Sequence, residues 1–310
     1  MRRSTAIRAA AATALAAGLA APLLRRRLPL PPAVTIATAA AAPLALTVLI
    51  PRSRARDVGT VCLQMWAYLA AYQMPNDDPA ALEARVLVDY PVRFDTWVGR
   101  GTPPTLRLQR ALGTPGGFAG WEKALVWSHW LWFAFPHGTA AYLLLRHRDQ
   151  LPRGAAQIYA TFDLGLIGYW VVPTAPPWYA AARGLFDDGR TPEVRRMMVE
   201  YGEQFWKSRW SPLYGVLGGN PLAAMPSLHF ATSVTAARVL WRSGRGAGTL
   251  GWAYALTLGT ALLYLGEHYV VDLLAGLALA EGVRLGTPLV TPLARRFSSL
   301  AQALEARARS

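Results

Sequence analysis

The sequence predicts an all-α protein built as a polytopic bundle of transmembrane helices, and three observations support this fold class. Over half of the 310 residues are apolar (53%) and only 16% are charged, whereas about a quarter of the residues in a soluble domain are charged. The mean hydropathy is +0.20. Twelve Trp and twelve Tyr residues fit the same class, because such rings collect at the interface between membrane and water.

The net charge of +14 comes almost wholly from Arg, since Lys occurs only at Lys123 and Lys207. In a membrane protein this excess is explained by cytoplasmic loops and by contacts with anionic lipids. The sequence has no basic stripe with interleaved aromatic residues, so we expect membrane lipids as partners and no nucleic acid. The single cysteine, Cys62, excludes an intramolecular disulfide and a thiolate zinc site. Its apolar neighbours predict a small buried side chain.

A spanning helix needs about 20 mainly apolar residues, and six segments of the chain fit this requirement. They are Thr60–Met74, which is short, and Ala124–Leu145, Ala155–Val172, Leu222–Trp241, Thr249–Leu265 and Tyr269–Val283. Two weaker apolar segments, Ala9–Leu24 and Ala33–Ile50, precede them and flank the cluster Arg25–Arg27. An Arg-flanked apolar start also fits a signal peptide, but a second apolar run follows at once without a clear cleavage site. We therefore expect an uncleaved hydrophobic hairpin.

Two long stretches, Pro75–Glu122 and Pro173–Pro221, are rich in Pro and charge, which indicates loops. We expect the first of them to be ordered and to contain short amphipathic helices. The chain is then expected to have three parts. These are an N-terminal hydrophobic hairpin (1–56), a six-span catalytic core (57–287) and a basic cytoplasmic tail (288–310).

The orientation in the cell membrane follows from arginines in short loops, which stay in the cytoplasm. Alternation of the spans places the arginine-rich connections on one side; these contain Arg52–Arg56, Arg146–Arg153, Arg242–Arg245 and Arg295–Arg296. The two long loops and the turn before Tyr269 then lie on the extracytoplasmic side of a multi-pass protein. The cluster Arg25–Arg27 is the exception, because a two-span hairpin would place it outside.

Three ionisable side chains are expected at this outer face, where such groups are costly and need an explanation. His268 and Asp272 are four residues apart at the start of the last span, so they share one helix face. A carboxylate there fixes the tautomer of the imidazole and raises the nucleophilicity of its other nitrogen. His229 follows Pro226 at the outer end of another span, where a helix N-terminus favours a phosphate. A lone polar residue in a span is often a helix contact, but a nucleophile beside a proton donor is what transfer through a phosphohistidine requires.

Two segments carry a specific resemblance to a known family. Ala224–His229 (Ala-Met-Pro-Ser-Leu-His) and Gly266–Asp272 (Gly-Glu-His-Tyr-Val-Val-Asp) resemble the second and third signature motifs of the type 2 phosphatidic acid phosphatase superfamily. With the loop Pro173–Trp178, they are most similar to the branch that includes fungal inositol phosphorylceramide synthases and sphingomyelin synthases. The resemblance covers roughly Trp66 to Val283 as a six-span core.

The resemblance implies a role for each matched residue. His268 would be the nucleophile, oriented by Asp272, and His229 would be the general acid that protonates the leaving alcohol. Ser227 would contact phosphate oxygens. The substrate would be a lipid phosphate or phosphodiester at the outer membrane face, with an alcohol as a possible acceptor. The resemblance implies neither a metal nor an organic cofactor.

The chain departs from the ordinary phosphatases of this superfamily at two places. Their first motif carries Lys and Arg, whereas Pro173–Trp178 is neutral, and Leu262 holds the place of an Arg six residues before the nucleophile. Phosphoryl transfer still needs positive charge near the phosphate oxygens. Lys207 and Arg209 are the substrate-binding candidates, with Arg183 as a third, although solvated loop charges are at least as common. The missing arginine favours transfer between lipid and alcohol over simple phosphomonoester hydrolysis.

His129 and His137 are too far apart in the sequence for an i, i+4 metal pair. With Pro136 and Gly138 nearby, a kink that lines the substrate cavity is one interpretation. Hydrogen bonding between helices is the favoured one. Asp95 fits either a contact to an alcohol acceptor or a solvated loop.

Three functions therefore stay open. The leading one is a metal-independent lipid phosphatase or phosphotransferase, and close to it stands a headgroup transferase like inositol phosphorylceramide synthase. The third is a transporter or scaffold without enzymatic activity. The His229, His268 and Asp272 set argues against a scaffold, and a transporter should show charged or broken helices near the midplane.

Overall fold

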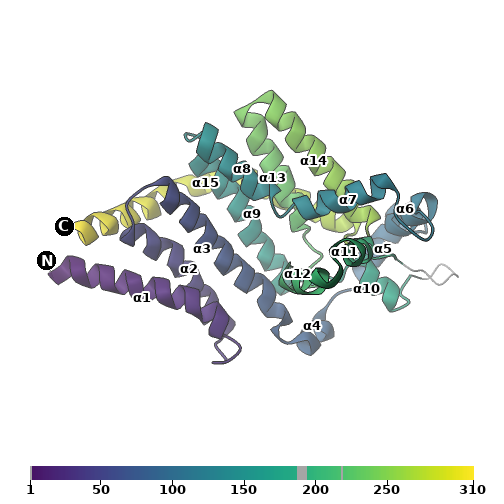
Figure 1. The fold of residues 1–310 in the computed structure, drawn as a ribbon, viewed down its shortest axis with the longest axis horizontal. Helices are drawn as coiled ribbons and strands as arrows, with labels where there is room; N and C mark the ends of the chain where they lie inside the picture. Colours follow the sequence, from purple (N-terminus) through teal and green to yellow (C-terminus); the bar gives the residue numbers. More distant parts are fainter. Residues whose placement is uncertain (1, 187–193, 218) are drawn as a thin grey trace. The chain divides into compact units, whose positions relative to one another are not determined.

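The computed structural model describes residues 2–186, 194–217 and 219–310 (Figure 1). Over these residues the named elements are helices, with two isolated β-bridges and no named strand, which confirms the all-α class. The chain divides into two compact units. Unit 1 contains Met1–Asp78 and Leu285–Ser310, and unit 2 contains Pro79–Arg284.

Unit 1 holds the predicted hairpin. Its elements are α1 (Arg2–Leu24), α2 (Pro32–Leu49), α3 (Arg54–Gln73), η1 (Met74–Asp77) and the last part of α15 (Val270–Arg309). α1 packs on α2 so closely that a Cβ atom on Gly18 would lie 2.7 Å from the Cβ atom of Ala42. α1, α2 and α15 contain stretches that are long and apolar enough to cross a membrane. The count of six further spans stays a prediction.

Three details of unit 1 differ from the sequence-based expectations or add to them. Residues 288–310, expected as a tail, continue α15 as far as Arg309, and Glu305 of this part forms an ion pair of 3.0 Å with Arg56. Cys62 is exposed on α3, so the prediction of a buried side chain was wrong. Apolar neighbours in the sequence do not by themselves bury a residue, since much of the surface of a folded protein is apolar.

The arginine cluster between α1 and α2 has a carboxylate partner. Asp77, at the end of η1, accepts hydrogen bonds from Arg25 (2.7 Å) and Arg26 (2.8 Å). The turn of the hairpin and the start of the first long loop therefore lie together within unit 1.

Unit 2 is arranged around α13, which packs on α14, α9 and α8. Its small apolar residues from Ala231 to Leu240 are mostly buried, so neighbouring helices approach it closely. The elements of unit 2 are α4 (Pro79–Arg85), α5 (Asp89–Val98), α6 (Pro104–Leu112), α7 (Gly120–Leu131), α8 (Phe135–Arg146), α9 (Leu151–Val171), α10 (Pro177–Ala182), α11 (Met197–Trp206), η2 (Lys207–Arg209), α12 (Trp210–Leu217), α13 (Leu228–Ser243), α14 (Arg245–Tyr264) and the first part of α15.

The predicted span Ala124–Leu145 is two helices rather than one. α7 ends at Leu131 and α8 begins at Phe135. The three residues between the helices, and Phe135 itself, donate their N–H groups to carbonyls three residues earlier, such as Ala134 N–H to Leu131 C=O (2.9 Å). Pro136 explains the break, because proline has no N–H for the carbonyl four residues earlier and disfavours helical backbone in the residue before it.

The predicted span Leu222–Trp241 starts six residues later than expected, because α13 begins at Leu228. Pro226 does not open the helix. Ser227 is the N-cap, and its side chain accepts a hydrogen bond from the Phe230 N–H (3.3 Å). The residues before it form turns and bends, with one bridge between Ala223 and Thr174, and the Ala224 N–H donates to the Thr174 carbonyl (3.0 Å).

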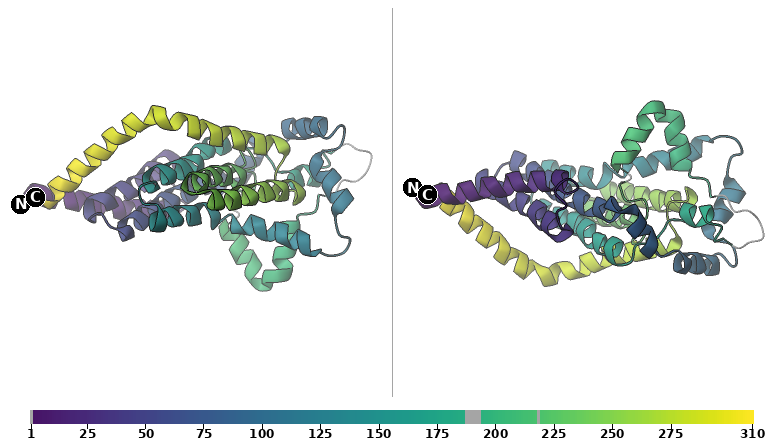
Figure 2. Two further views of the ribbon diagram at one scale, coloured as in Figure 1. Left: turned by 90° about the horizontal axis from the view of Figure 1, so that it is seen from above. Right: turned by 90° about the horizontal axis from the view of Figure 1, so that it is seen from below.

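The long loops are ordered by short helices, as expected for Pro75–Glu122, which contains α4, α5 and α6. In Pro173–Pro221 the described residues form α10, α11, η2 and α12; residues 187–193 and 218 of this loop lie outside the described part. In both views of Figure 2 the green α11–α12 segment stands out from the α13–α14 pair. Aromatic side chains join this segment to the rest of unit 2, with Trp130 of α7 stacked on Tyr201 of α11 (5.7 Å between ring centroids).

Candidate active site

The three predicted catalytic residues come together in unit 2. His268 lies in the turn before α15, and its Nδ1 atom is 3.3 Å from Oδ2 of Asp272 in the first turn of that helix. Both side chains are buried, with exposures of 3% and 0%. The Asp272 carboxylate also accepts the backbone N–H of Tyr269 (2.8 Å), so it is held in place by the helix start and orients the imidazole from below.

His229 approaches the other nitrogen of His268. The Nδ1 atom of His229 is 3.4 Å from Nε2 of His268. Two backbone features bring the starts of α13 and α15 together. The Ser227 N–H donates to the Asp272 carbonyl (3.0 Å), and a Cβ atom on Gly276 would lie 2.6 Å from the Ser227 carbonyl oxygen, so only glycine permits this approach.

A third histidine belongs to the cluster. The centre of the His129 ring, at the end of α7, lies 4.6 Å from the centre of the His229 ring. The ring of Trp132, which lies between α7 and α8, is 4.1 Å from the same His229 ring. Trp132 is fixed to α13 by a hydrogen bond to Thr232 (2.8 Å). The Nδ1 atom of His129 is buried and has no hydrogen-bond partner within the described residues. The expected helix-to-helix hydrogen bond is therefore not made by this nitrogen of His129.

The same expectation is confirmed for His137, whose Nδ1 atom lies 3.2 Å from the Tyr159 hydroxyl on α9. His147, after α8, lies 3.1 Å from the hydroxyl of Tyr142. Neither residue is part of the His229–His268 cluster as these contacts define it.

Asp95 of α5 holds the start of α15. Its carboxylate accepts the backbone N–H groups of Val270 (2.9 Å) and Val271 (3.4 Å), and its side chain is fully buried. The expectation of a solvated loop residue was therefore wrong, because the first turn of α15 has N–H groups that need acceptors. Burial, with a further contribution from Asp272, raises the pKa of Asp95 to about 7.

The neutral segment Pro173–Trp178 lies beside the second motif. Thr174 forms parallel bridges with Leu87 on one side and Ala223 on the other, and its hydroxyl is 2.7 Å from that of Tyr90. The place of the missing first motif is thus fixed by backbone pairing rather than by charge.

The three sequence-predicted cations occupy peripheral positions. Lys207 and Arg209 lie on η2 with exposed side chains. Arg183 pairs with Glu83 (3.2 Å), and both side chains are about half exposed. These contacts do not bring any of the three next to the histidines.

Arg196, at the N-cap of α11, was missed by the sequence interpretation. Its guanidinium carbon lies 3.7 Å from the centre of the Trp178 ring, and the group donates to the Tyr214 hydroxyl (2.9 Å). Its Nε atom is buried without a partner among the described residues. Burial raises the pKa of Glu267, which precedes His268, above its usual value, although the charge of Arg196 acts against this rise. No local pattern distinguishes Arg196 from the other arginines of the loop.

Ser227, the predicted phosphate contact, is fully buried beneath His229 as the cap of α13. Within the described residues, no three His, Cys, Asp or Glu side chains are grouped to hold a metal ion. The arrangement offers one imidazole held by a carboxylate and a second imidazole facing it, which suits a nucleophile and a proton carrier.

Comparison with known proteins identifies one curated relative and the family of this chain. A curated relative, the phosphoinositol dihydroceramide synthase of Bacteroides thetaiotaomicron, is 32% identical over 126 residues, which cover 38% of this chain and 39% of that protein. The chain thus aligns with well under two thirds of the relative's length. No solved structure matches the chain. Residues 123–284, just over half of the chain and including all three histidines of the cluster, match the PAP2 superfamily. The protein therefore belongs to the PAP2 superfamily, a family of lipid phosphatases and phosphotransferases.

Proposed function

We propose that the protein transfers a phosphoryl group from a lipid phosphate or phosphodiester through a phosphohistidine on His268, at the extracytoplasmic face of the cell membrane. The observation that carries the proposal is the position of His268 between Asp272 (3.3 Å) and His229 (3.4 Å). When Nδ1–H of His268 donates to the Asp272 carboxylate, Nε2 carries the free lone pair and lies toward His229.

In the first step, Nε2 of His268 attacks phosphorus and the bond from phosphorus to the leaving oxygen breaks. His229 gives that oxygen a proton, so the leaving group departs as a neutral alcohol. In the second step, the acceptor oxygen attacks the phosphohistidine, the P–N bond breaks, and His229 takes up the acceptor's proton. The phosphoryl group must enter between the two imidazoles, so the 3.4 Å contact between them opens when substrate binds.

The positive charge that this reaction needs is assigned first to Arg196, because it lies against Trp178 at the place of the neutral first motif. Lys207 and Arg209 are assigned contacts with the outer part of the headgroup, since exposed side chains of a loop suit that place. Ser227 contributes by fixing the start of α13 and by its nearness to the phosphate site.

Two observations support the outer face. The arginines of the short loops favour the opposite, cytoplasmic side. The long loops carry the residues that hold the site, among them Asp95 and Arg196.

A second candidate is transfer of a phospho-alcohol headgroup between lipids. The relative named phosphoinositol dihydroceramide synthase favours it, and so does Leu262 at the position where the ordinary phosphatases carry an arginine. The two candidates share the phosphohistidine and differ only in whether water or an alcohol releases it.

The test uses purified protein in detergent with radiolabelled lipid phosphates and a phosphoinositol lipid, with and without dihydroceramide as acceptor. We expect label on the protein that is lost in acid, as for a phosphohistidine, and a fall of at least about 10³-fold in turnover for His268→Ala. His147→Gln, outside the cluster, is the matched control and keeps full activity. Turnover that persists in His268→Ala would contradict the assignment of His268 as the nucleophile. Loss of activity with a chelator would contradict metal independence.

A further inference from the structure

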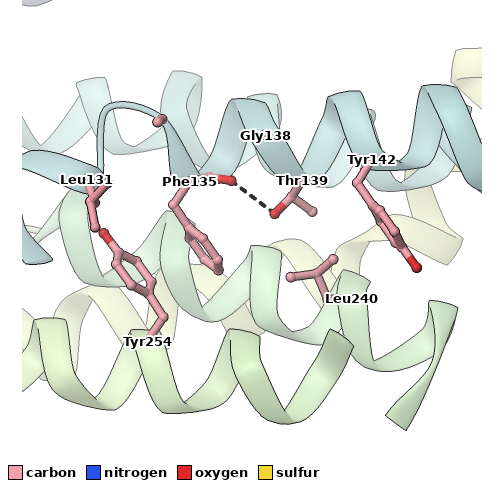
Figure 3. Close-up of a pocket in the computed structure, with 8 residues that line it drawn as sticks. Leu131, Phe135, Gly138, Thr139, Tyr142, Leu240 and Tyr254 are labelled. Carbon is pink, nitrogen blue, oxygen red and sulfur yellow. Dashed lines mark hydrogen bonds between the residues drawn. The ribbon is translucent and has the colours of Figure 1, made fainter. Parts of the chain in front are cut away.

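An apolar groove of about 310 Å³ runs along α8 (Figure 3). Its walls come from the break before α8, from one face of α8, and from α13 and α14. The lining residues are Leu131, Ala134, Phe135, Gly138, Thr139, Tyr142, Leu240 and Tyr254.

The polar groups in these walls already have partners. The Thr139 hydroxyl donates to the Phe135 carbonyl of its own helix (3.0 Å), as the dashed line in Figure 3 shows. The Tyr254 hydroxyl donates to the Ser128 carbonyl (2.8 Å), and the Tyr142 hydroxyl pairs with His147 (3.1 Å). A polar ligand would lose its hydrogen bonds to water here and gain none, which costs several kcal/mol. The groove therefore suits a hydrocarbon.

One end of the groove adjoins the histidine cluster. Leu131 and Ala134 line it and flank Trp132, whose ring lies 4.1 Å from that of His229. At the break between α7 and α8, Trp132 thus lies against His229, whereas Leu131 and Ala134 line the groove. A molecule with its phosphate at His268 could lay an apolar chain past this break.

The dimensions fit one lipid tail. From Phe135 to Tyr142, α8 advances roughly 10 Å at 1.5 Å per residue, and one leaflet of a bilayer core is about 15 Å thick. The groove therefore holds roughly two thirds of a chain that spans one leaflet. Its volume lies at the lower end of the range for small-molecule sites.

We propose that this groove binds one hydrocarbon tail of the lipid whose phosphate reaches His268, and so sets the chain-length preference of the enzyme. The proposal rests on the proposed function for the headgroup end and adds a site for the tail. A tail that leaves the bilayer for the groove exchanges one apolar environment for another, so the gain comes from packing and orientation. We expect selectivity between chains rather than a large gain in affinity.

Gly138 provides the variant that tests this site. A Cβ atom at Gly138 would meet nothing within 4 Å, so the side chain of Gly138→Leu starts in open space and takes up room in the groove, and leucine favours a helix more than glycine does. Gly282 of α15 is equally open and exposed but does not line the groove. Gly282→Leu is therefore the matched control.

The first measurement is kcat/KM for one headgroup with short and long acyl chains. We expect Gly138→Leu to lower the ratio of long-chain to short-chain kcat/KM about three- to tenfold, and Gly282→Leu to leave the ratio unchanged. An active wild type with the same ratio in both variants would overturn the groove site while leaving the proposed function intact.

The second measurement does not depend on turnover. A phosphatidic acid with a diazirine in its tail is crosslinked to the protein in detergent, and labelled peptides are mapped by mass spectrometry. We expect label on α8 and α13 in the wild type and in His268→Ala, loss of this label in Gly138→Leu, and its retention in Gly282→Leu. Groove-specific label in a wild-type protein that turns over none of the lipids would support the lipid site and contradict the proposed function. Label spread evenly over the helices in all variants would contradict the site.

Discussion

The two sides of the break between α7 and α8 differ in chemistry although they are a few residues apart. On one side, His129 and Trp132 contact His229. On the other side, Leu131 and Ala134 begin an almost wholly apolar groove. One interruption of a helix thus separates a cluster of imidazole rings from an apolar surface. That division matches a lipid, whose phosphate and tail need opposite surroundings within a short distance.

The division also separates what each kind of change should do. A change on the polar side should lower turnover of every lipid, because all substrates share the phosphate. A change in the groove should alter which lipids are used, because only the tail differs among them. The predictions below test the polar side, from the largest effect to the smallest.

The largest effect is expected for Asp272→Asn. The asparagine oxygen can still accept the Tyr269 N–H, so the helix start is kept, but the amide can donate to Nδ1 of His268 and favour the wrong tautomer. We expect kcat to fall about 10³- to 10⁴-fold for short-chain and long-chain lipids alike, as when the carboxylate of a hydrolase triad is replaced by an amide. Turnover and acid-labile protein label measure this effect.

The control for Asp272→Asn is its melting temperature, which should stay within a few degrees of the wild type if the cap is preserved. A variant that keeps more than a tenth of the wild-type kcat would show that Asp272 serves the helix start alone and does not orient His268.

A smaller effect separates the cations. A charge-assisted hydrogen bond contributes about 1.5–3 kcal/mol, so Arg196→Gln should lower kcat/KM about 10- to 100-fold if Arg196 meets the phosphate. Arg209→Gln is the matched control: an exposed charge contributes about 0–1 kcal/mol, and its variant should stay within about fivefold of the wild type. Arg196→Lys should restore part of the loss, because it restores charge without the planar group that lies over Trp178.

The opposite order of effects would contradict the assignment of Arg196 as the phosphate contact. A larger loss in Arg209→Gln or Lys207→Gln than in Arg196→Gln would move the phosphate contact to the exposed η2 segment.

The sequence was informative where the signal is local. His268 and Asp272 are four residues apart across the start of α15, and His229 lies within a recognisable segment, so pattern and spacing predicted that the three side chains meet. The helical class followed from composition for the same reason. The predicted span Leu222–Trp241 began too early, because apolar residues also precede Ser227. There the backbone pairs with Thr174 instead of forming a helix.

Other parts of the site depend on contacts between distant segments. Asp95 lies 175 residues before Val270, whose N–H it accepts, and nothing in the loop sequence indicates which helix it caps. Arg196 is one of many arginines and differs from them only by its place against Trp178. His129 looked like a helix contact because the break that turns it toward His229 is a tertiary feature.

The smallest effect concerns Asp95, which shares the start of α15 with Asp272. In an unfolded chain an Asp carboxyl has a pKa near 3.9, whereas burial raises the pKa of Asp95 to about 7 in the folded protein. Between these values the folded state binds the proton more firmly, so its stability falls as the pH rises from about 4 to about 7. Asn at this position keeps an acceptor for Val270 and cannot ionise. The melting temperature of Asp95→Asn relative to the wild type should therefore rise by about 2–4 °C between about pH 5 and about pH 8. Thermal unfolding in detergent across this range measures it, and a difference that stays constant with pH would mean that Asp95 holds α15 without titrating.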